Sequence, residues 1–552
     1  SFPTRRSSDL EEELPFLTAA LSWLNTPVAD EADPNAPDKN KNYWSAFGEW
    51  YFVGYGEGCA PLEAWSAKNP IFVIAQVYLN GVSAGEAYLS EVGSQVYAVG
   101  TNGYDITEDV KSRLAARGDQ MITNQDIPVP TWFVNYDAAD HSLQYWKTAN
   151  DCSPSGTQNA DYGTVYVQAG DSDAWQTQYA GPISKVAVDS RQSLSGREIH
   201  DFLTCYTRYD NTSAYGNALM LRGDYTDVIV NAHKSPDRYA EQKVTMPDGA
   251  TATMICTIVD IEGEPREILF YIPDNASELQ PDGAPVITAW AGGSQTNIIF
   301  FDSTCWWETA NQNGIALIFT NEAYNTSVAV TPADVDACYH AMLDLLEGWN
   351  DSGKFQFDLS RIYSTGQSMG SMESQQFAQE TPDYYAAVAS TSFYQDYPDA
   401  HSDKPIPTYL INGEGNGKDD TGTPYDDRWN RTDDWAQYFL RVNGFVYTPA
   451  VYAADGTVTT FGVPVSEPVF TVTGPYDRFE TYTWINEQDI PLVQYTNSLY
   501  RPHNCLTSEI PMLWDFLEHY RCERDEDGAV TARYYSASAF ERDDQVLIQF
   551  GA

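Results

Sequence analysis

Apolar runs and helical patterns alternate along the second half of the chain. Continuous apolar runs at 285–290, 314–320 and 361–365 are typical of buried strands. A helical pattern at 331–348 starts with a capping threonine followed by proline. β-type runs at 243–259 precede these elements. The alternation predicts the α/β class, with a mostly parallel sheet covered by helices on both faces and opened by antiparallel strands.

Four blocks of the first half recur in the same order in the second half. The longest, 49–70, aligns with 361–382 without a gap and places Gly56 on Ser368. The other pairs are Pro130–Asn135 with Pro407–Asn412, Gln144–Asn150 with Gln437–Asn443, and Asp201–Tyr206 with Asp515–Tyr520. Blocks so far apart predict duplication of a domain and not a short repeat.

These patterns suggest how the chain is divided. We expect a partial domain at 11–206, a linker at 207–236, a complete domain at 237–524 and a C-terminal tail at 525–552. Residues 1–10 are basic, unlike the acidic chain that follows, and resemble translated sequencing adapter. We interpret them as an artefact and expect the native N-terminus to be missing.

Composition narrows the possible partners. The 552 residues include 78 acidic and 31 basic side chains, for a formal charge of −47. This charge argues against nucleic acid or an anionic membrane as a partner, and no apolar run reaches the length of a membrane span. Eight cysteines without a C-x-x-C pair argue against a zinc ribbon, and their even number permits disulfides without assigning them. The oligomeric state is not indicated.

One G-x-S-x-G segment has the context of a nucleophile elbow. Gly366-Gln-Ser368-Met-Gly370 lies between the apolar run 361–365 and a helical pattern at 371–380, and strand, turn and helix are what this motif requires. Ser368 is therefore the candidate nucleophile.

A second G-x-S-x-G match, Gly81–Gly85, follows the apolar run 71–79, which corresponds to the strand after the elbow helix. We therefore expect Ser83 to be an ordinary loop serine.

An activated serine needs a base and an orienting acid. His503 follows the last core strand pattern, 490–496, in a loop before a C-terminal helical pattern, and is the candidate base. The acid is expected after the strand pattern 407–412. Its candidates in that turn are Asp419, which we favour, then Glu414, with Asn416 and Asp420, and an acid elsewhere remains an alternative. Among the other histidines, His401 is a weaker base candidate, and His340 is expected to be structural. His519 is expected on the last turn of the C-terminal helix, where a cation suits the helix dipole.

An acyl-transfer site also needs two converging backbone N–H groups for the oxyanion. One should come from Met369, the residue after the nucleophile. The other should come from the glycine-rich loop that follows strand 285–290, where Gly293, together with Ser294, is the candidate.

Residues 240–522 resemble the polyhydroxybutyrate depolymerase and feruloyl esterase type of α/β-hydrolase. The segments that carry the resemblance are Arg266–Pro273, Gly292–Thr296, Gly366–Gly370, Pro382–Val388, and His503 before Trp514–Phe516. The resemblance implies a secreted serine esterase with Ser368 and His503 as catalytic residues and no metal or organic cofactor. Two positions depart from the family pattern: Ala291 stands where the family often has histidine, and Asn416 stands where the usual acid falls.

The first half resembles the back part of the same fold. Its elbow position is Gly56, and 181–199 contains no histidine where the repeat would place the base. We expect two tandem copies, the first incomplete and inactive. The leading functional hypothesis is hydrolysis of a small or polymeric carboxylic ester, either a polysaccharide-linked acyl or feruloyl ester or a polyhydroxyalkanoate. The alternatives are a non-catalytic binding protein and a serine peptidase of the same fold.

Overall fold

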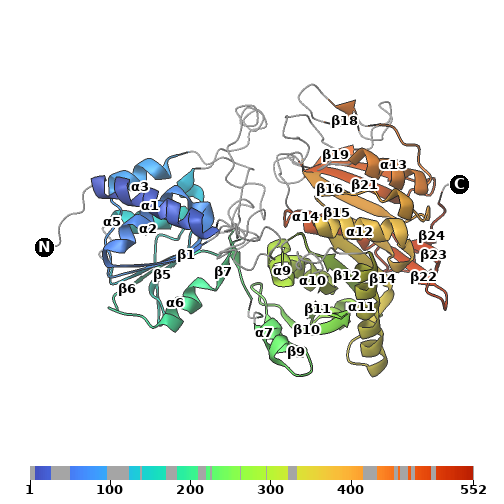
Figure 1. Ribbon diagram of the computed structural model, residues 1–552, viewed down its shortest axis with the longest axis horizontal. Coiled ribbons are helices and arrows are strands. Elements are labelled where there is room, and N and C mark those ends of the chain that lie inside the picture. Colours follow the sequence, from blue (N-terminus) through green and yellow to red (C-terminus); the bar gives the residue numbers. More distant parts are fainter. Residues whose placement is uncertain are drawn as a thin grey trace, which may run out of the picture. The chain divides into compact units, whose positions relative to one another are not determined.

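The computed structural model forms two compact units, Ser1–Arg222 and Gly223–Ala552 (Figure 1). The described residues are 7–25, 50–95, 123–136, 140–169, 183–208, 219–223, 225, 227–261, 263–293, 295–320, 332–413, 432–449, 451–452, 458–460, 470–473, 479–498 and 505–550. Each unit has its own sheet, so the two are described separately.

The second unit is built on an eleven-stranded sheet with the order β19-β20-β21-β16-β15-β14-β12-β13-β11-β10-β9. In chain order the strands are β9 (Tyr239–Thr245), β10 (Thr251–Ile261), β11 (Glu264–Pro273), β12 (Ala284–Trp290), β13 (Ala316–Thr320), β14 (Phe357–Gly366), β15 (Ala387–Thr391), β16 (Thr408–Gly413), β19 (Phe470–Thr473), β20 (Phe479–Ile485) and β21 (Pro491–Ser498). The six central strands, from β21 to β13, pair in parallel. Strands β9 to β11 and β19 to β20 are antiparallel additions at the two edges. The mostly parallel sheet with an antiparallel front is confirmed.

Helices cover both faces of this sheet, as predicted. They are α7 (Asp227–Lys234), α8 (Ala276–Leu279), α9 (Asn297–Thr304), α10 (Trp306–Asn313), α11 (Pro332–Ser352), α12 (Met369–Glu380), α13 (Thr432–Val442) and α14 (Glu509–Leu517). Neighbouring residues of a strand point to opposite faces. On β14, the Ser364 hydroxyl donates to Ser374 of α12, whereas the Tyr363 ring packs against Trp514 of α14. Helices α12 and α14 therefore lie on opposite faces.

The segment 525–552 was predicted to be a C-terminal tail, but it carries two strands of a small folded sheet. Strands β22 (Tyr520–Arg524), β23 (Val530–Tyr535) and β24 (Val546–Leu547) form a three-stranded antiparallel sheet. Arg533 of β23 is only 4% exposed, and its guanidinium donates to the carbonyl oxygens of Pro382, Tyr385 and Ala386. Because these carbonyls precede β15, the C-terminal sheet is part of the second unit.

The first unit has a six-stranded sheet with the order β1-β2-β3-β6-β5-β4. Its strands are β1 (Trp50–Tyr55), β2 (Val73–Leu79), β3 (Thr131–Val134), β4 (Thr157–Asn159), β5 (Gly163–Val167) and β6 (Lys185–Asp189), and its helices are α1 (Ser7–Asn25), α2 (Cys59–Lys68), α3 (Glu86–Gly93), α5 (Asp140–Ala149) and α6 (Gly196–Leu203). Strands β1, β2, β3 and β6 are parallel, and β4 and β5 form an antiparallel edge. The series β14-β15-β16-β21-β20-β19 repeats this order and these directions.

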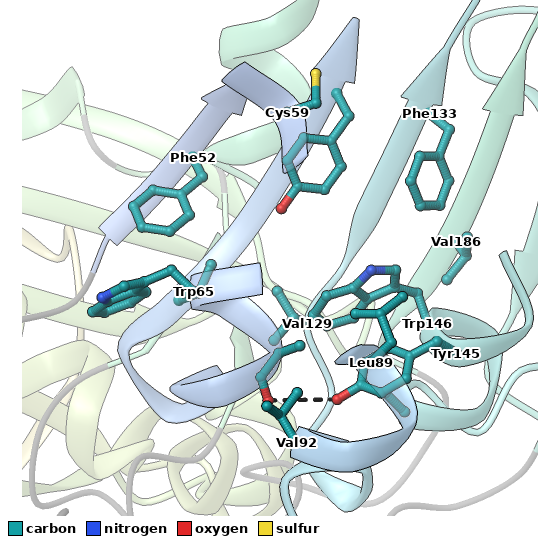
Figure 2. Packing of buried hydrophobic residues seen from close by; sticks show 14 of the residues in the cluster. Phe52, Cys59, Trp65, Leu89, Val92, Val129, Phe133, Tyr145, Trp146 and Val186 are labelled. Atoms are coloured by element: carbon teal, nitrogen blue, oxygen red, sulfur yellow. Dashed lines mark hydrogen bonds between the residues drawn. The ribbon is translucent and has the colours of Figure 1, made fainter. Parts of the chain in front are cut away.

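The core of the first unit lies on both faces of its sheet. On one face, Phe133 packs with Trp146 of α5 and Leu89 of α3 (Figure 2). On the other face, Trp132 packs against Phe202 of α6, with ring centroids 5.3 Å apart. The alternation of these residues along β3 explains why helices are needed on both sides.

Matched positions in the two units share local contacts. The Asn150 amide at the end of α5 donates to the Trp146 and Val129 carbonyl oxygens at 2.7 and 2.9 Å. The Asn443 amide at the end of α13 donates to the carbonyls of Phe439 and Ile406 at 2.8 and 3.0 Å. Each asparagine thereby joins a helix end to the residue before the proline that precedes a parallel strand.

The predicted linker, 207–236, is also corrected. Its first part belongs to the first unit, because β7 (Tyr206–Thr207) pairs with β8 (Met220–Leu221). Its second part contains α7, which packs on β9 and β10 of the second unit. The boundary lies between Arg222 and Gly223.

At the other end of the chain, helix α1 begins at Ser7, inside the segment interpreted as an artefact, and Leu10 is buried. The interpretation of residues 1–10 as translated adapter sequence stays a prediction. Within the described residues, none of the eight cysteines is paired in a disulfide. Among the described residues, no helix is both long and apolar enough for a membrane span.

Arg533 provides a test of the corrected C-terminus. We expect Arg533→Leu to lower the free energy of unfolding by about 3 kcal/mol, because three buried carbonyl groups lose their donor. Urea unfolding followed by tryptophan fluorescence measures the effect. Arg542→Leu, at an exposed position, is the control and should change stability by less than about 0.5 kcal/mol. Equal effects of the two substitutions would contradict a packed C-terminal sheet.

Candidate active site

Ser368 occupies a strained turn between β14 and α12. Its φ of 58° and ψ of −116° lie outside the main backbone regions of L residues. Strand β14 ends at Gly366 and α12 begins at Met369, so the serine stands where strand becomes helix. Its side chain is partly exposed. This is the conformation expected of a nucleophile elbow.

The two glycines of the motif are required by close backbone packing. A Cβ atom at Gly366 would overlap the Gly370 carbonyl, and one at Gly370 would overlap the Trp290 carbonyl at the end of β12. Backbone cannot give way as the end of a flexible side chain can. The turn can therefore form only with glycine at both positions.

Hydrogen bonds tie the turn to the strands on both sides. The Ser368 N–H donates to the Thr391 carbonyl oxygen of β15 at 3.2 Å. The Gln367 N–H donates to the Trp290 carbonyl oxygen of β12 at 3.4 Å. The serine is therefore fixed at the carboxyl edge of the parallel sheet, where α/β proteins bind ligands.

The two predicted oxyanion residues lie next to one another. A Cβ atom added to Gly293 would be 2.8 Å from the Met369 Sδ atom. Met369 is the first residue of α12, so its N–H has no acceptor within the helix. The Gly292 N–H, in contrast, donates to the Gln295 side chain at 2.8 Å. The glycine-rich loop and the start of α12 are therefore adjacent.

A buried carboxylate that the sequence interpretation missed lies close to the elbow. Glu509, at the start of α14, is 0% exposed. It accepts hydrogen bonds from the Thr391 hydroxyl at 3.0 Å and the Leu506 N–H at 3.4 Å. The only sequence signal was an acid in the first turn of an apolar helix. Glu509 therefore connects the segment before α14 to Thr391 of β15, whose carbonyl oxygen accepts the Ser368 N–H.

Polar side chains are also buried at the carboxyl ends of the next two parallel strands. Asn412 of β16 pairs in register with Asn497 of β21, and Gly413 pairs with Ser498. Asn497 is 1% exposed and Ser498 0% exposed, and neither side chain has a hydrogen-bond partner within the described part of the chain. Buried polar groups are normally paired, so these two side chains distinguish this edge of the sheet from an apolar core.

The remaining predicted site residues lie outside the described residues. These are His503, Asp419, Glu414, Asn416, Asp420 and Ser294. The structure therefore brings together Ser368, Met369 and Gly293 only.

His401 is not a base for Ser368. Its Nε2 atom lies 2.7 Å from Asp396, which also accepts from the Tyr394 hydroxyl. The next residue, Ser402, donates its N–H to Gln379 near the end of α12. Ten residues of helix separate Gln379 from Met369, which is about 15 Å. The His401–Asp396 pair therefore lies at the wrong end of the helix.

His340 has a structural contact, as predicted, whereas His519 lies after α14, which ends at Leu517, and not on its last turn. His340 Nε2 lies 3.1 Å from the Tyr384 hydroxyl, and His519 Nδ1 lies 2.7 Å from the Ser536 carbonyl oxygen.

Burial holds the pKa of Tyr385 well above its usual value. The Tyr385 hydroxyl therefore stays neutral, and its oxygen accepts a hydrogen bond from the Thr288 hydroxyl at 3.2 Å.

Comparison with known proteins gives only partial matches. No family model matches the chain. No curated protein matches it either. Among solved structures, an acetyl xylan esterase from Aspergillus awamori is 13% identical and matches 45% of this chain and 93% of its own, with a TM-score of 0.30. An S-formylglutathione hydrolase from Agrobacterium tumefaciens is 12% identical over 31% of this chain and 79% of its own, with a TM-score of 0.25. A feruloyl esterase module from Clostridium thermocellum is 10% identical over 29% and 67%, with a TM-score of 0.23.

The packing of Gly370 predicts a sharp response to one added methyl group. We expect Gly370→Ala to slow the reaction of Ser368 with a fluorophosphonate probe about 10²-fold or more, because the serine is displaced from its turn. The rate is measured by intact-protein mass spectrometry. In the control Gly348→Ala, the new methyl group meets open space on α11, so labelling should be unchanged. Normal labelling of Gly370→Ala would contradict the elbow geometry.

Proposed function

We propose that this protein is a serine esterase that hydrolyses carboxylic esters. The observation that carries the proposal is the strained Ser368, whose φ is 58° at the carboxyl end of the central parallel strand, beside Met369 and Gly293. Ser368 attacks the ester carbonyl, and the N–H groups of Met369 and Gly293 stabilise the oxyanion. The alcohol leaves, and water then cleaves the acyl-enzyme. This chemistry uses no metal or organic cofactor.

His503 is the proposed base. The described chain on both sides of 499–504 supports this role, since Ser498 ends β21 at the carboxyl edge and the Leu506 N–H donates to Glu509. Glu509 in turn accepts from Thr391, whose carbonyl accepts from Ser368. His503 lies three positions before Leu506, and an extended chain of that length spans at most about 10 Å. This short span supports the proposal that His503 reaches the serine.

Asp419 is the proposed acid that orients His503, with Glu414 the next candidate. Strand β16 ends at Gly413, which pairs with Ser498 of β21. An acid that follows β16 and a histidine that follows β21 therefore start from adjacent positions on one edge of the sheet. The buried Asn497 and Ser498 at this edge support a polar constellation there.

We further propose that the two units are tandem copies of one fold. The shared strand order and the matched contacts of Asn150 and Asn443 support duplication. Gly56 stands at the elbow position of the first unit with a φ of 60°, so that copy carries no nucleophile there. The proposed substrates are polysaccharide-linked acyl or feruloyl esters or polyhydroxyalkanoate-type polyesters, and the proposed location is outside the cell.

Substitution of the nucleophile tests the proposal directly. We expect Ser368→Ala to lower kcat for an aryl ester by about 10⁴-fold or more, because removal of the nucleophile leaves only binding and oxyanion stabilisation. Initial rates with purified protein measure this. Ser277→Ala, on the surface of α8, is the control. A wild-type chain that neither hydrolyses a panel of aryl, acetyl, feruloyl and hydroxyalkanoate esters nor reacts with the probe at Ser368 would favour a non-catalytic binding protein.

A panel of isosteric amides identifies the acid. Asp419→Asn, Glu414→Gln and Asp420→Asn each remove one negative charge from the turn after β16. We expect only Asp419→Asn to lower kcat strongly, by about 10²–10⁴-fold, because the histidine loses the carboxylate that fixes its tautomer. Full activity in all three variants would place the acid elsewhere in the chain.

A further inference from the structure

The serine that sequence analysis set aside has an unexpected partner. Ser83 lies in the loop between β2 and α3, as expected of a loop residue. Its Oγ atom, however, lies 2.9 Å from Nε2 of His141, which comes from helix α5. Both side chains are partly exposed. A serine hydroxyl in contact with an imidazole nitrogen is the basic requirement for an activated nucleophile.

The pair belongs to a longer chain of hydrogen bonds that ends on a buried carboxyl group. Ser83 Oγ lies 2.5 Å from Ser142 Oγ, and Ser142 is hydrogen-bonded to Glu63, which is 0% exposed. Glu63 also accepts from the Ala84 N–H at 2.7 Å and the Trp146 indole at 3.1 Å. Burial raises the pKa of Glu63, which favours a neutral carboxyl group.

The protonation state of Glu63 decides which group donates in each hydrogen bond of this chain. With Glu63 neutral, it donates to Ser142, Ser142 donates to Ser83, and Ser83 donates to an unprotonated His141 Nε2. With Glu63 ionised, the same bonds run in the opposite direction, from His141 Nε2–H to Glu63. Only the first arrangement leaves His141 Nε2 unprotonated and able to accept the Ser83 proton, so the reactive form is the one with a neutral Glu63.

The position of the loop in the fold adds to the argument. Ser83 and His141 follow β2 and β3 at the carboxyl edge of a parallel sheet, the edge used by ligands in α/β proteins. A Cβ atom at Gly81 would lie 3.0 Å from the Gly56 carbonyl oxygen, so this loop adjoins the elbow position that lacks a nucleophile. Cys59, also in this region, is not the nucleophile, because burial raises its pKa to about 12.

We propose that Ser83 is a second reactive serine, which accepts an acyl group from an activated ester with His141 as its base. Ser83 Oγ bonds to the carbonyl carbon while its proton moves to His141 Nε2. The bond from that carbon to the leaving oxygen then breaks, and the departing alkoxide takes the proton back from His141. The N–H of Ala84, the residue after the serine, is already used by Glu63. The usual oxyanion donor is therefore engaged, so we expect slow acylation and a long-lived adduct.

The test uses the full-length chain and a fluorophosphonate probe, with peptide mapping by mass spectrometry. In this reaction Ser83 Oγ bonds to phosphorus, fluoride leaves, and the proton passes to His141. We expect a label on the peptide that contains Ser83 in both the wild-type chain and Ser368→Ala, which separates this site from the proposed esterase site. The wild-type measurement requires no substitution in the first unit.

Two variants in the Ser368→Ala background complete the test. His141→Gln should slow Ser83 labelling about 10²-fold, because glutamine cannot take the proton. Ser94→Ala removes an exposed hydroxyl that donates to the Glu91 carbonyl oxygen, and it should leave the rate unchanged. Two results would overturn the proposal. One is an unlabelled Ser83 peptide in the wild-type chain. The other is equal labelling of Ser83 in His141→Gln.

Discussion

The second unit depends on the close contact between the backbone of Gly370 and the Trp290 carbonyl group. This contact lets α12 start directly at the end of β14 and forces Ser368 into a backbone conformation that costs about 1–3 kcal/mol. The cost can be met because β14 lies between two parallel neighbours, and each receives an N–H from the turn. The strain is thus a property of the whole parallel core, and a loop serine could not be held in the same way.

The turn of the first unit that aligns with the elbow differs in this constraint. Gly56 has almost the same φ as Ser368, 60° against 58°, but glycine adopts a positive φ without strain. At Gly58, the counterpart of Gly370, an added Cβ atom would meet open space. The first turn is therefore packed tightly at Gly54, which aligns with Gly366 and lies against Cys59, but not at Gly58. A further tight contact with Cys59 lies at Gly81, in the loop that carries Ser83.

The sequence predicted those features that depend on local patterns. Apolar runs marked β12, β13 and β14, and the strand–turn–helix context singled out Ser368, because burial and backbone geometry both leave their trace in neighbouring residues. Features that depend on distant partners were missed. Strand β23 carries a buried arginine whose acceptors lie far along the chain, and a charged residue is not expected in a core. Glu509 and the Ser83–His141 pair, 58 residues apart, likewise give no local signal.

Buried polar groups at one edge of each sheet unite these observations. Burial of a polar side chain costs free energy unless it is paired, and an apolar residue would pack the same space more cheaply. Yet the carboxyl edge of the second sheet buries Asn497, Ser498 and Glu509, and that of the first buries Glu63 and Ser142. The opposite edge of the second sheet has its own buried charge, Arg533, but its guanidinium donates to three backbone carbonyls. Asn497 and Ser498 have no such partners among the described residues, so their burial costs stability, and this cost supports the site proposed at that edge.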